Sequence, residues 1–542
     1  MYNNWIVLLP PIVVLLLAFT THRVIFSLLC GIITAALILN NFSISQTIQT
    51  TVSKIWENSE LGAFLSWEAF KNNWGLFIFL FLIILGVIVV LITHSGGAYA
   101  YADYIKKKLK NKKATETSSL ILSLFFFIDD HLSTLTVGSV MHPLCDKFKI
   151  ARAKLAFLVD SMAAPICVIA PISSWAAYII MQLKKTGVNK VPQYGTYILA
   201  DPFFTFLETI PFVFYSLIMI ASTWLIVRGS ISIGLMKKHE AVAEKTGNLF
   251  AGKNPTKRKI RNPAETHEKN ASMYDFLLPI IVLIVSVIVS LLYLGNFYLF
   301  GGTNNLIETF QATQTAPALF IGGTISLIFS LILFFIRKKL TFPDLPSIFK
   351  EGYDLTISTI VVLILAWTLS DLLKNDLKTG QYLASLLLGH LSIKLLPFMF
   401  FVATAATSFA MGSAWGSMAV MIPIAIPLLI SFMQLTIPVV PQSLPILFPV
   451  LGAILSGGVS GNHTSPISDT TIMSATSSGS YHIDHVKTQY TYAIPVLCCT
   501  GISFLVSGFM ISYNIYFNIF ASLGTGILCN FGYLILRNNL KK

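Results

Sequence analysis

Long apolar runs, separated by short polar segments, follow one another along the whole chain. Many of them approach the ~20 residues that a helix needs to cross the hydrocarbon of a bilayer. Shorter or broken apolar segments lie around 119–144 and 412–432. The pattern predicts an all-α, polytopic integral membrane protein with about 11–13 transmembrane helices. The expected spans lie at roughly 5–20, 23–40, 75–93, 155–182, 203–228, 273–294, 316–336, 354–373, 395–411, 444–460, 490–514 and 516–536.

Composition supports this class. The 542 residues are 55% hydrophobic and only 11% charged, and the mean hydropathy is +0.73. A soluble globular chain carries about 25% charged residues. The longest polar stretch, about 236–272, is a Lys/Glu/Asn linker too short for a folded soluble domain. A soluble enzyme or receptor domain is therefore not expected, and no nucleophile–base pair or metal-ligand cluster points to an enzyme.

The formal net charge of +13 gathers in short loops at the ends of the apolar runs. Basic residues crowd 105–113, 237–261 and 337–339 and the last two positions. This is the distribution that orients membrane proteins, because loops rich in Lys and Arg stay in the cytoplasm. We therefore expect these loops and the C-terminus in the cytoplasm, and we expect no nucleic-acid partner.

The cysteines and the N-terminus add little to the functional prediction. The six cysteines show no disulfide or zinc spacing. The first residues, MYNNWIVLLPP, lack a positively charged region and a small-residue cleavage site, so we expect a retained first helix instead of a signal peptide.

Two regions of the chain resemble each other. FFIDDHLSTLTVGSVMHP (126–143) aligns with SFAMGSAWGSMAVMIP (408–423), and SMAAPICVIAPISSW (161–175) aligns with SGGVSGNHTSPISDT (456–470). The second alignment places Pro171-Ile172-Ser173 on Pro466-Ile467-Ser468. We interpret this as an internal duplication.

The flanking charges give the two copies opposite orientations. Basic residues flank 119–144 on both sides, so this segment is expected to enter the membrane and turn back near Asp129-Asp130-His131. Between Lys394 and Asp469 there is no charged residue, which suits a hairpin that opens to the other side. The pattern predicts two inverted-topology repeats, each with a re-entrant hairpin and a discontinuous helix.

The polar segment GNHTSPISDTT (461–471) follows an apolar run directly. In transporters with inverted repeats, broken helices expose backbone carbonyls and helix ends near the membrane midplane. We interpret 461–471 as such an unwound stretch, in which carbonyls and hydroxyls face an ion. A plain cytoplasmic loop is the alternative, since Ser, Thr, Gly and Pro are also typical of loops.

Carboxylates within membrane segments are costly, so each suggests a function. The candidates are Asp129, Asp130, Asp160 and Asp469. A carboxylate in a partly dehydrated cavity can hold either a proton or a small hard cation such as Na⁺, and this competition is sufficient for exchange. In a helix, neighbouring Asp129 and Asp130 would point about 100° apart and would not share a ligand.

Simpler interpretations stay open for these residues. Asp129-Asp130 can form a solvated or capping turn at the hairpin tip, and Asp160 can pair with Lys154 or Arg152. His131 and His463 can relay protons or only hydrogen-bond a neighbour. HIDH (482–485) has no second ligand cluster and is expected to be a membrane-proximal cytoplasmic turn.

A family resemblance rests on these same segments. FFIDDHLSTLTVGSVMHPLCDKFKIARAKLAFLVDSMAAPICVIAPISSWAAYI and GNHTSPISDTTIMSAT…HIDHVKTQYTYAIP resemble the two signature regions of the NhaC family of sodium/proton antiporters. SPISDTT and the IDD…DS…AP pattern are the most specific parts. The resemblance runs through most of the chain and implies an antiporter of the bacterial cytoplasmic membrane that works without ATP. The broader family also includes exchangers of malate/lactate or amino acids.

Two functions follow from the residues and the resemblance. The leading function is Na⁺/H⁺ exchange by alternating access. One half-site would consist of Asp469, Ser465, Ser468 and Thr470, and the other of Asp160, Ser161 and Ser173. Asp160 and Asp469 would be the Na⁺ ligands. The alternative is ion-coupled transport of a small organic solute, an amino acid or a carboxylate, gripped by hydroxyl-rich hairpins and helix N-termini.

The second hairpin has the sequence SFAMGSAWG and carries no charge. It can therefore contribute to the ion site only through Ser413, Ser408, Ser417 and its backbone. We expect no cofactor. The partners are Na⁺ and H⁺ or a small solute and the lipid bilayer, and a homodimer stays open.

The expected organisation has six parts. They are 1–74 (N-terminal helices and an extracytoplasmic loop), 75–235 (first transport repeat), 236–272 (cytoplasmic linker), 273–353 (connecting helices), 354–514 (second transport repeat) and 515–542 (C-terminal helix and basic tail).

Overall fold

The computed structural model describes most of the chain. The described residues are 5–21, 23–97, 100, 111–193, 195–254, 271–305, 309, 313–379, 382, 386 and 392–539. The predicted basic runs within 101–110 and 255–270 and the last two lysines lie outside these residues.

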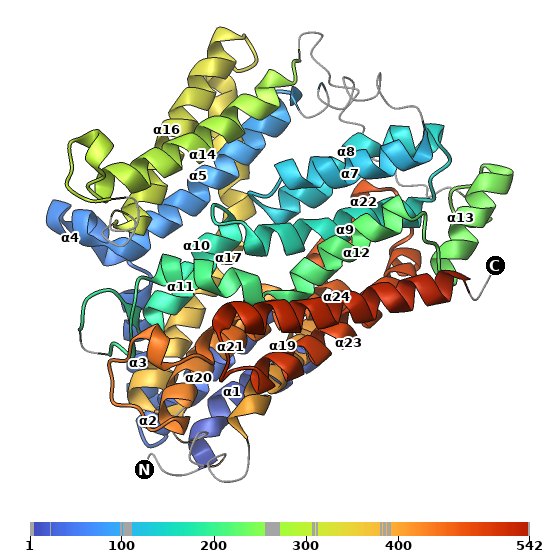
Figure 1. The fold of residues 1–542 in the computed structure, drawn as a ribbon. Helices are drawn as coiled ribbons and strands as arrows, with labels where there is room; N and C mark the ends of the chain where they lie inside the picture. Colours follow the sequence, from blue (N-terminus) through green and yellow to red (C-terminus); the bar gives the residue numbers. More distant parts are fainter. Residues whose placement is uncertain are drawn as a thin grey trace.

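The described residues are almost entirely helical (Figure 1). The N-terminal part holds α1 (Leu9–Thr21), α2 (Val24–Leu39), α3 (Ile44–Asn58), α4 (Trp67–Asn72), α5 (Trp74–His94), α7 (Lys112–Phe125), α8 (Asp130–Lys147), α9 (Arg152–Ile169), α10 (Ser174–Lys185), α11 (Pro202–Thr209), α12 (Phe214–Arg228) and α13 (Gly234–Thr246). The C-terminal part holds α14 (Tyr274–Leu294), α16 (Thr315–Ile336), α17 (Leu345–Asp371), α19 (Leu396–Met411), α20 (Ala414–Phe432), α21 (Leu447–Thr464), α22 (Asp469–Ser477), α23 (His482–Phe509) and α24 (Ile515–Asn539). Short strands β1 (Val188–Asn189) and β2 (Ile198–Leu199) pair in parallel.

The predicted apolar runs all coincide with helices, which confirms a polytopic all-α membrane fold. Within the described residues, 8 helices are long and apolar enough to cross a membrane, or up to 10 when each bent pair is taken as one span. The apolar parts of α1 and α2 are shorter. Segment 412–432, expected to be short or broken, instead forms the continuous helix α20 with Pro423 and Pro427 inside it. Membrane helices tolerate such prolines because neighbouring groups satisfy the freed carbonyls.

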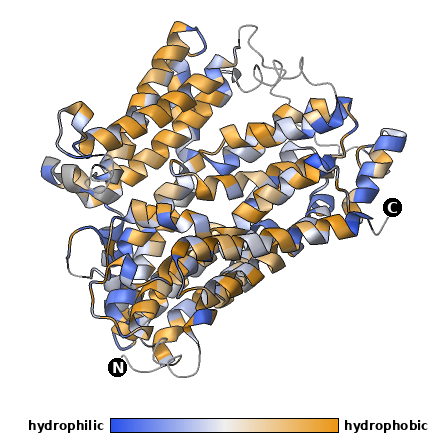
Figure 2. Cartoon of the chain, in the orientation of Figure 1, coloured by the Kyte–Doolittle hydropathy of each residue, from blue (hydrophilic) through white to orange (hydrophobic). Residues whose placement is uncertain are grey.

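The outer surface of the helices is apolar. Figure 2 shows hydrophobic colour along α14 and α16, with hydrophilic colour concentrated near the helix ends. On α16 the exposed side chains Ile321, Ile325, Ile328 and Ile332 recur every three or four residues and form one face. An apolar face of this kind suits contact with lipid, because its exposure to water would be energetically unfavourable.

Two copies of one motif form the centre of the molecule. Helices α7 and α8 form a hairpin whose turn lies at 126–129, followed by the broken pair α9/α10, which bends by 44°. Helices α19 and α20 form a second hairpin with its turn at Gly412 and Ser413, followed by the broken pair α21/α22. In Figure 1 the α7–α8 hairpin extends toward α13 and the C-terminus, whereas α20 lies toward the opposite side.

The two helix breaks correspond residue by residue. Helix α9 ends at Ile169 and α10 begins at Ser174; helix α21 ends at Thr464 and α22 begins at Asp469. The intervening residues, 170–173 and 465–468, are those that the Pro-Ile-Ser alignment pairs. Of the segment 461–471 expected to be unwound, only these four central residues leave the helix.

Candidate functional site

Both hairpin tips and both helix breaks meet in the centre of the protein. The Ser174 N–H donates to the Ile128 carbonyl at 2.9 Å, joining the first tip to the first break. At the second tip, the Asn462 amide donates to the Gly412 carbonyl at 3.4 Å. The rings of Trp175 and Trp415 lie 4.8 Å apart and link the first break to the second hairpin. Four elements far apart in sequence therefore enclose one region.

Gly412 is required for this junction. Its φ is 63°, in the left-handed region, and a Cβ there would lie 2.9 Å from the Ile467 carbonyl oxygen of the second break. Only glycine adopts this conformation without strain and allows the two backbones to approach so closely.

The first hairpin tip carries a cluster of ionisable side chains. Asp129, Asp130 and His131 each offer one ligand atom, and these atoms lie within 4.8 Å of one another. Helix α8 begins only at Asp130, so Asp129 is not helical and the expected 100° separation of the two carboxylates does not apply. Asp129 accepts a hydrogen bond from the Ser174 hydroxyl at 2.9 Å. Asp130 is buried, and its Oδ1 has no partner among the described residues.

His131 connects this cluster to the second repeat. Its Nε2 lies 3.1 Å from Oδ2 of Asp469, the first residue of α22. The other oxygen of Asp469 accepts from the Thr470 N–H at 2.8 Å. The Asp469 side chain is 46% exposed, because it faces a cavity.

That cavity has a volume of about 600 Å³ and a mainly apolar wall. Its polar lining comes from Arg23, His131, Ser413 and Asp469, and its apolar lining includes Trp415 and residues of α2 and α17. Cavities of this size and polarity are typical of small-molecule sites.

Helix N-termini converge on the same region. Helices α8, α10, α20 and α22 begin at Asp130, Ser174, Ala414 and Asp469. A helix N-terminus carries partial positive charge. The arrangement therefore surrounds the tip carboxylates with the partial positive ends of several helices.

A second polar network lies behind the break of α21/α22. Oδ2 of Asp160, which is fully buried on α9, accepts hydrogen bonds from Thr471 at 3.2 Å and from Gln489 at 2.6 Å, and lies 3.2 Å from His485 Nε2. Gln489 also donates to the His463 carbonyl at 2.7 Å. His463 Nδ1 in turn lies 3.3 Å from the Tyr215 hydroxyl. This network joins the broken helices of both repeats to α23.

Two interpretations from the sequence are wrong here. HIDH, expected to be a membrane-proximal cytoplasmic turn, is not a turn: it begins α23, with His485 fully buried against Asp160 and His482 bonded to the Pro466 carbonyl at 2.7 Å. Nor does Asp160 pair with Lys154 or Arg152. Lys154 lies 3.5 Å from Glu240, and Arg152 lies 2.6 Å from Asp146.

The structure divides the remaining predicted residues among different roles. Ser161 donates to the Leu158 carbonyl, and Ser173 caps α10 while donating to carbonyls of Cys167 and Ala170, so neither hydroxyl bonds Asp160. Ser413 caps α20. Ser465 and Ser468 lie buried in the second break, and Thr470 donates to Asn462 Oδ1 at 2.7 Å.

Several residues that hydrogen-bond to the candidate site residues were not identified from the sequence. They are Ser174, Tyr215, Asn462, Thr471, His485 and Gln489. One signal was present for two of them. His485 and Gln489 are four residues apart, which places them on one helix face.

An ion cluster holds α13 against α7 and α9. Lys112 and Lys154 lie 3.2 and 3.5 Å from Oε1 of Glu240 on α13, and Ser232 donates to Oε2. Burial opposes ionisation of Glu240, but the two ammonium groups outweigh it and hold its pKa below the ordinary value. The cluster therefore fastens α13 most firmly while Glu240 is charged.

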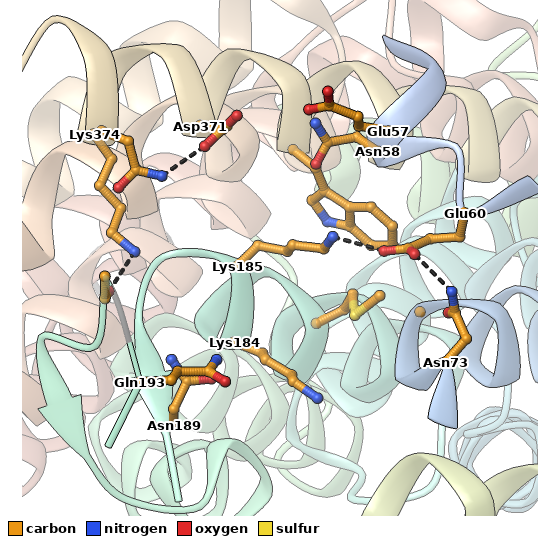
Figure 3. Close-up of a pocket in the computed structure, with 15 residues that line it drawn as sticks. Glu57, Asn58, Glu60, Asn73, Lys184, Lys185, Asn189, Gln193, Asp371 and Lys374 are labelled. Atoms are coloured by element: carbon orange, nitrogen blue, oxygen red, sulfur yellow. Dashed lines mark hydrogen bonds and ion pairs between the residues drawn. The ribbon is translucent and has the colours of Figure 1, made fainter. Parts of the chain in front are cut away.

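A second cavity, of about 450 Å³, lies at the far end of α10 (Figure 3). Its lining comes from α3, α10, the β1 region and the end of α17. In Figure 1 these elements lie on the side of the molecule opposite to α13. Helix α10 thus runs from the tip cluster to this cavity.

Comparisons with known proteins show what this chain is similar to. The model of the Na⁺/H⁺ antiporter family matches residues 200–509. An uncharacterized protein of Haemophilus influenzae is 32% identical over 514 residues, covering 93% of this chain and 91% of that protein. The structure of Neisseria gonorrhoeae MtrF, described as illuminating a class of antimetabolite efflux pumps, matches with a TM-score of 0.50 and 14% identity over 91% of this chain and 85% of that chain. The YdaH transporter of Alcanivorax borkumensis matches with a TM-score of 0.46 and 12% identity, over 89% of this chain and 88% of that chain.

Proposed function

Because the chain belongs to the Na⁺/H⁺ antiporter family, a family of transporters, we propose that it exchanges Na⁺ for H⁺ across the membrane by alternating access. The observation that supports this most directly is the cluster of Asp129, Asp130 and His131 at the first hairpin tip. This cluster faces Asp469 of the other repeat, at a point enclosed by both helix breaks.

The tip carboxylates are suited to competition between two cations. Carboxylate oxygens are hard ligands that bind small hard cations, and Asp130 Oδ1 is buried with no partner among the described residues. A proton on Asp130 removes the charge that a sodium ion needs, and a bound sodium ion disfavours protonation. Loading of one ion therefore requires release of the other.

His131 and Asp469 couple this exchange to the movement of the repeats. The imidazole of His131 lies on the hairpin of the first repeat, and its partner Asp469 begins α22 of the second. A change of charge at the tip alters this contact, because its strength depends on the charges of the neighbouring carboxylates. In our proposal this contact links ion occupancy to the inward- or outward-facing state.

Asp160 acts in this proposal as a positioning residue. Its carboxylate is bonded to Thr471 of α22 and to His485 and Gln489 of α23. The network fixes the first turn of α22, and with it Asp469, relative to α9. Asp160 keeps this role whether or not it also binds an ion.

The proposal is tested with purified protein in sealed liposomes that contain a trapped pH dye. Na⁺, Li⁺ and K⁺ are added separately across an imposed pH gradient. We expect Na⁺ to trigger proton flux, and we expect Asp130→Asn and Asp469→Asn to lose it. Asp484→Asn is the matched control, since Asp484 pairs with the exposed Lys253 and belongs to neither the tip cluster nor the Asp160 network. Undiminished proton flux in Asp469→Asn would show that Asp469 is not part of the mechanism. If no cation triggers proton flux in the wild type, cation exchange is refuted.

A second candidate function is supported by the cavity of about 600 Å³ beside Asp469. This volume and its mainly apolar wall exceed what a bare ion needs and suit an organic solute. Under this alternative, a small carboxylate or amino acid is transported together with Na⁺ or H⁺. Uptake of a labelled organic solute driven by a sodium gradient, without cation-triggered proton flux, would favour the alternative.

We further propose that the protein resides in a bacterial cytoplasmic membrane, with α13 and the C-terminus in the cytoplasm. The transported partners are Na⁺ and H⁺, no cofactor takes part, and a homodimer is compatible with the proposal.

A further inference from the structure

The cavity at the far end of α10 lies apart from the tip cluster and has charged walls of its own. Figure 3 shows Lys374 at one end of this cavity and Glu57 and Glu60 at the other, with Lys184 and Lys185 between them. Its volume of about 450 Å³ lies within the range of small-molecule sites.

Most charges around the cavity are already paired. Glu60 accepts from Lys185 at 2.7 Å and from Asn73 at 2.8 Å. Asp371 accepts from Lys54 and Asn375, both at 2.6 Å. These carboxylates already accept hydrogen bonds from other residues and are not hydrogen-bonded to the remaining donors of the wall.

Lys374 is the exception among the cations. Its side chain is buried, at 6% exposed. It donates one hydrogen bond, to the Gly195 carbonyl at 2.7 Å, lies over the Tyr197 ring at 4.9 Å, and forms no ion pair with a described residue. An ammonium group has three donors, and a buried charge without a counter-ion is costly. Two of its donors are therefore available to an acceptor in the cavity.

Trp367 closes the wall beside Lys185. The residue is fully buried, and its indole Nε1 is out of reach of the cavity, so it serves as a rigid part of the wall and not as a donor. Its ring is held in place by stacking on Phe79 at 4.9 Å and by Lys185 above it at 4.9 Å.

The backbone beside Lys374 is also unusual. Residues Leu372–Asp376 form a π-helix that ends α17. Such turns are rare and occur frequently at functional sites, because the wider turn presents side chains that an α-helix would not place together. Here the turn carries both Lys374 and Asn375 into the cavity wall.

From these donors we propose that the cavity binds a small organic carboxylate. The carboxylate would accept from the Lys374 ammonium, and the amides of Asn189, Gln193 and Asn375 would bind its second oxygen and polar substituents. The site opens on the side opposite to α13, which we expect to be extracytoplasmic. It does not depend on the proposed cation exchange.

The test uses full-length protein in lipid nanodiscs without ion gradients. Sodium acetate and sodium glycolate are titrated at constant sodium concentration and ionic strength, against sodium chloride and sodium sulfate. Tryptophan fluorescence and the unfolding temperature are recorded. We expect both carboxylates to produce a saturable change in both signals and the inorganic anions to produce none.

Variants assign the site. We expect Lys374→Met to weaken carboxylate binding about tenfold or more, since it removes a charge-assisted hydrogen bond. Gln193→Leu removes an amide at an exposed position of the wall and should also weaken binding. Lys190→Met, at an exposed lysine of the neighbouring strand region, controls for net charge and should bind as the wild type does.

Three results would overturn the proposal: equal responses to chloride or sulfate, no saturable response to either carboxylate, or unchanged binding in Lys374→Met. If Lys374→Met does not fold, unchanged binding in Gln193→Leu is the contradicting result. Asp130→Asn separates the two proposals, because it should lose cation exchange yet bind carboxylates as the wild type does.

Discussion

Replacement of Gln489 by leucine removes two hydrogen bonds from the network behind the second helix break. The Gln489 amide donates to Asp160 at 2.6 Å and to the His463 carbonyl at 2.7 Å, and all three residues are buried. Leucine has a similar size and leaves the packing nearly unchanged, so the loss of polar contacts dominates the effect.

The expected magnitude follows from these two contacts. A hydrogen bond to a charged group contributes about 1.5–3 kcal/mol, and a buried carbonyl left without a donor costs about 1–3 kcal/mol. Together we expect the free energy of unfolding to fall by about 3–5 kcal/mol, the range found when a buried charge loses a partner. Because the network positions α22 and Asp469, cation-driven proton flux should fall as well.

The assay compares Gln489→Leu with Gln182→Leu in mixed micelles, with helical content followed as the fraction of denaturing detergent rises. Gln182 is also fully buried but donates one hydrogen bond to a neutral carbonyl, that of Ala419 at 3.3 Å. We expect this control to lose only about 1 kcal/mol. If Gln489→Leu is no less stable than Gln182→Leu, the reasoning that Asp160 is a charged, structurally essential group is refuted.

Two further predictions concern contacts around the transport repeats. Acid should release α13. The pKa of Glu240 is held below its ordinary value of 4.5, so its charged carboxylate stabilises the docking of α13 at pH values above 4.5. This contribution is lost as the pH falls through the lowered pKa of the folded protein. Hydrogen exchange over 234–246 should therefore accelerate at acidic pH, and Glu240→Gln should show that faster exchange already at pH 7; equal exchange in variant and wild type would contradict this. Gly138→Ala should lower stability by about 1–3 kcal/mol, because a Cβ at Gly138 would lie 2.6 Å from the Ser477 Cβ where α8 crosses α22. Gly524→Ala, where a Cβ meets open space, is the control, and equal unfolding temperatures of the two variants would disprove a tight crossing.

The positions of the helices could be predicted because lipid imposes one simple pattern. Apolar runs near 20 residues long become helices wherever they occur, and each predicted span has its helix. The two breaks were also predictable, since Pro171 and Pro466 with their flanking Ser residues interrupt otherwise apolar sequences.

The contacts within the site could be predicted only in part. A turn near Asp129-Asp130-His131 followed from charge on both sides of the hairpin, and the structure has it at 126–129. The convergence of the Asp129 and Asp130 carboxylates depended on where α8 begins. Asp160 and His485 are 325 residues apart, and no local pattern indicates which helices bring them together. HIDH was expected to be a turn because its polarity is typical of loops, yet it begins α23, and its His485 lies 3.2 Å from Asp160.

The central claim is that sodium and protons compete for the carboxylates at the first hairpin tip. The most direct test measures the sodium concentration for half-maximal proton flux in liposomes at a series of pH values. If one proton and one sodium ion exclude each other, that concentration rises about tenfold for each unit of pH decrease in the range where the carboxylates take up protons. A half-saturating sodium concentration that does not change with pH, in protein that still exchanges, would contradict the account.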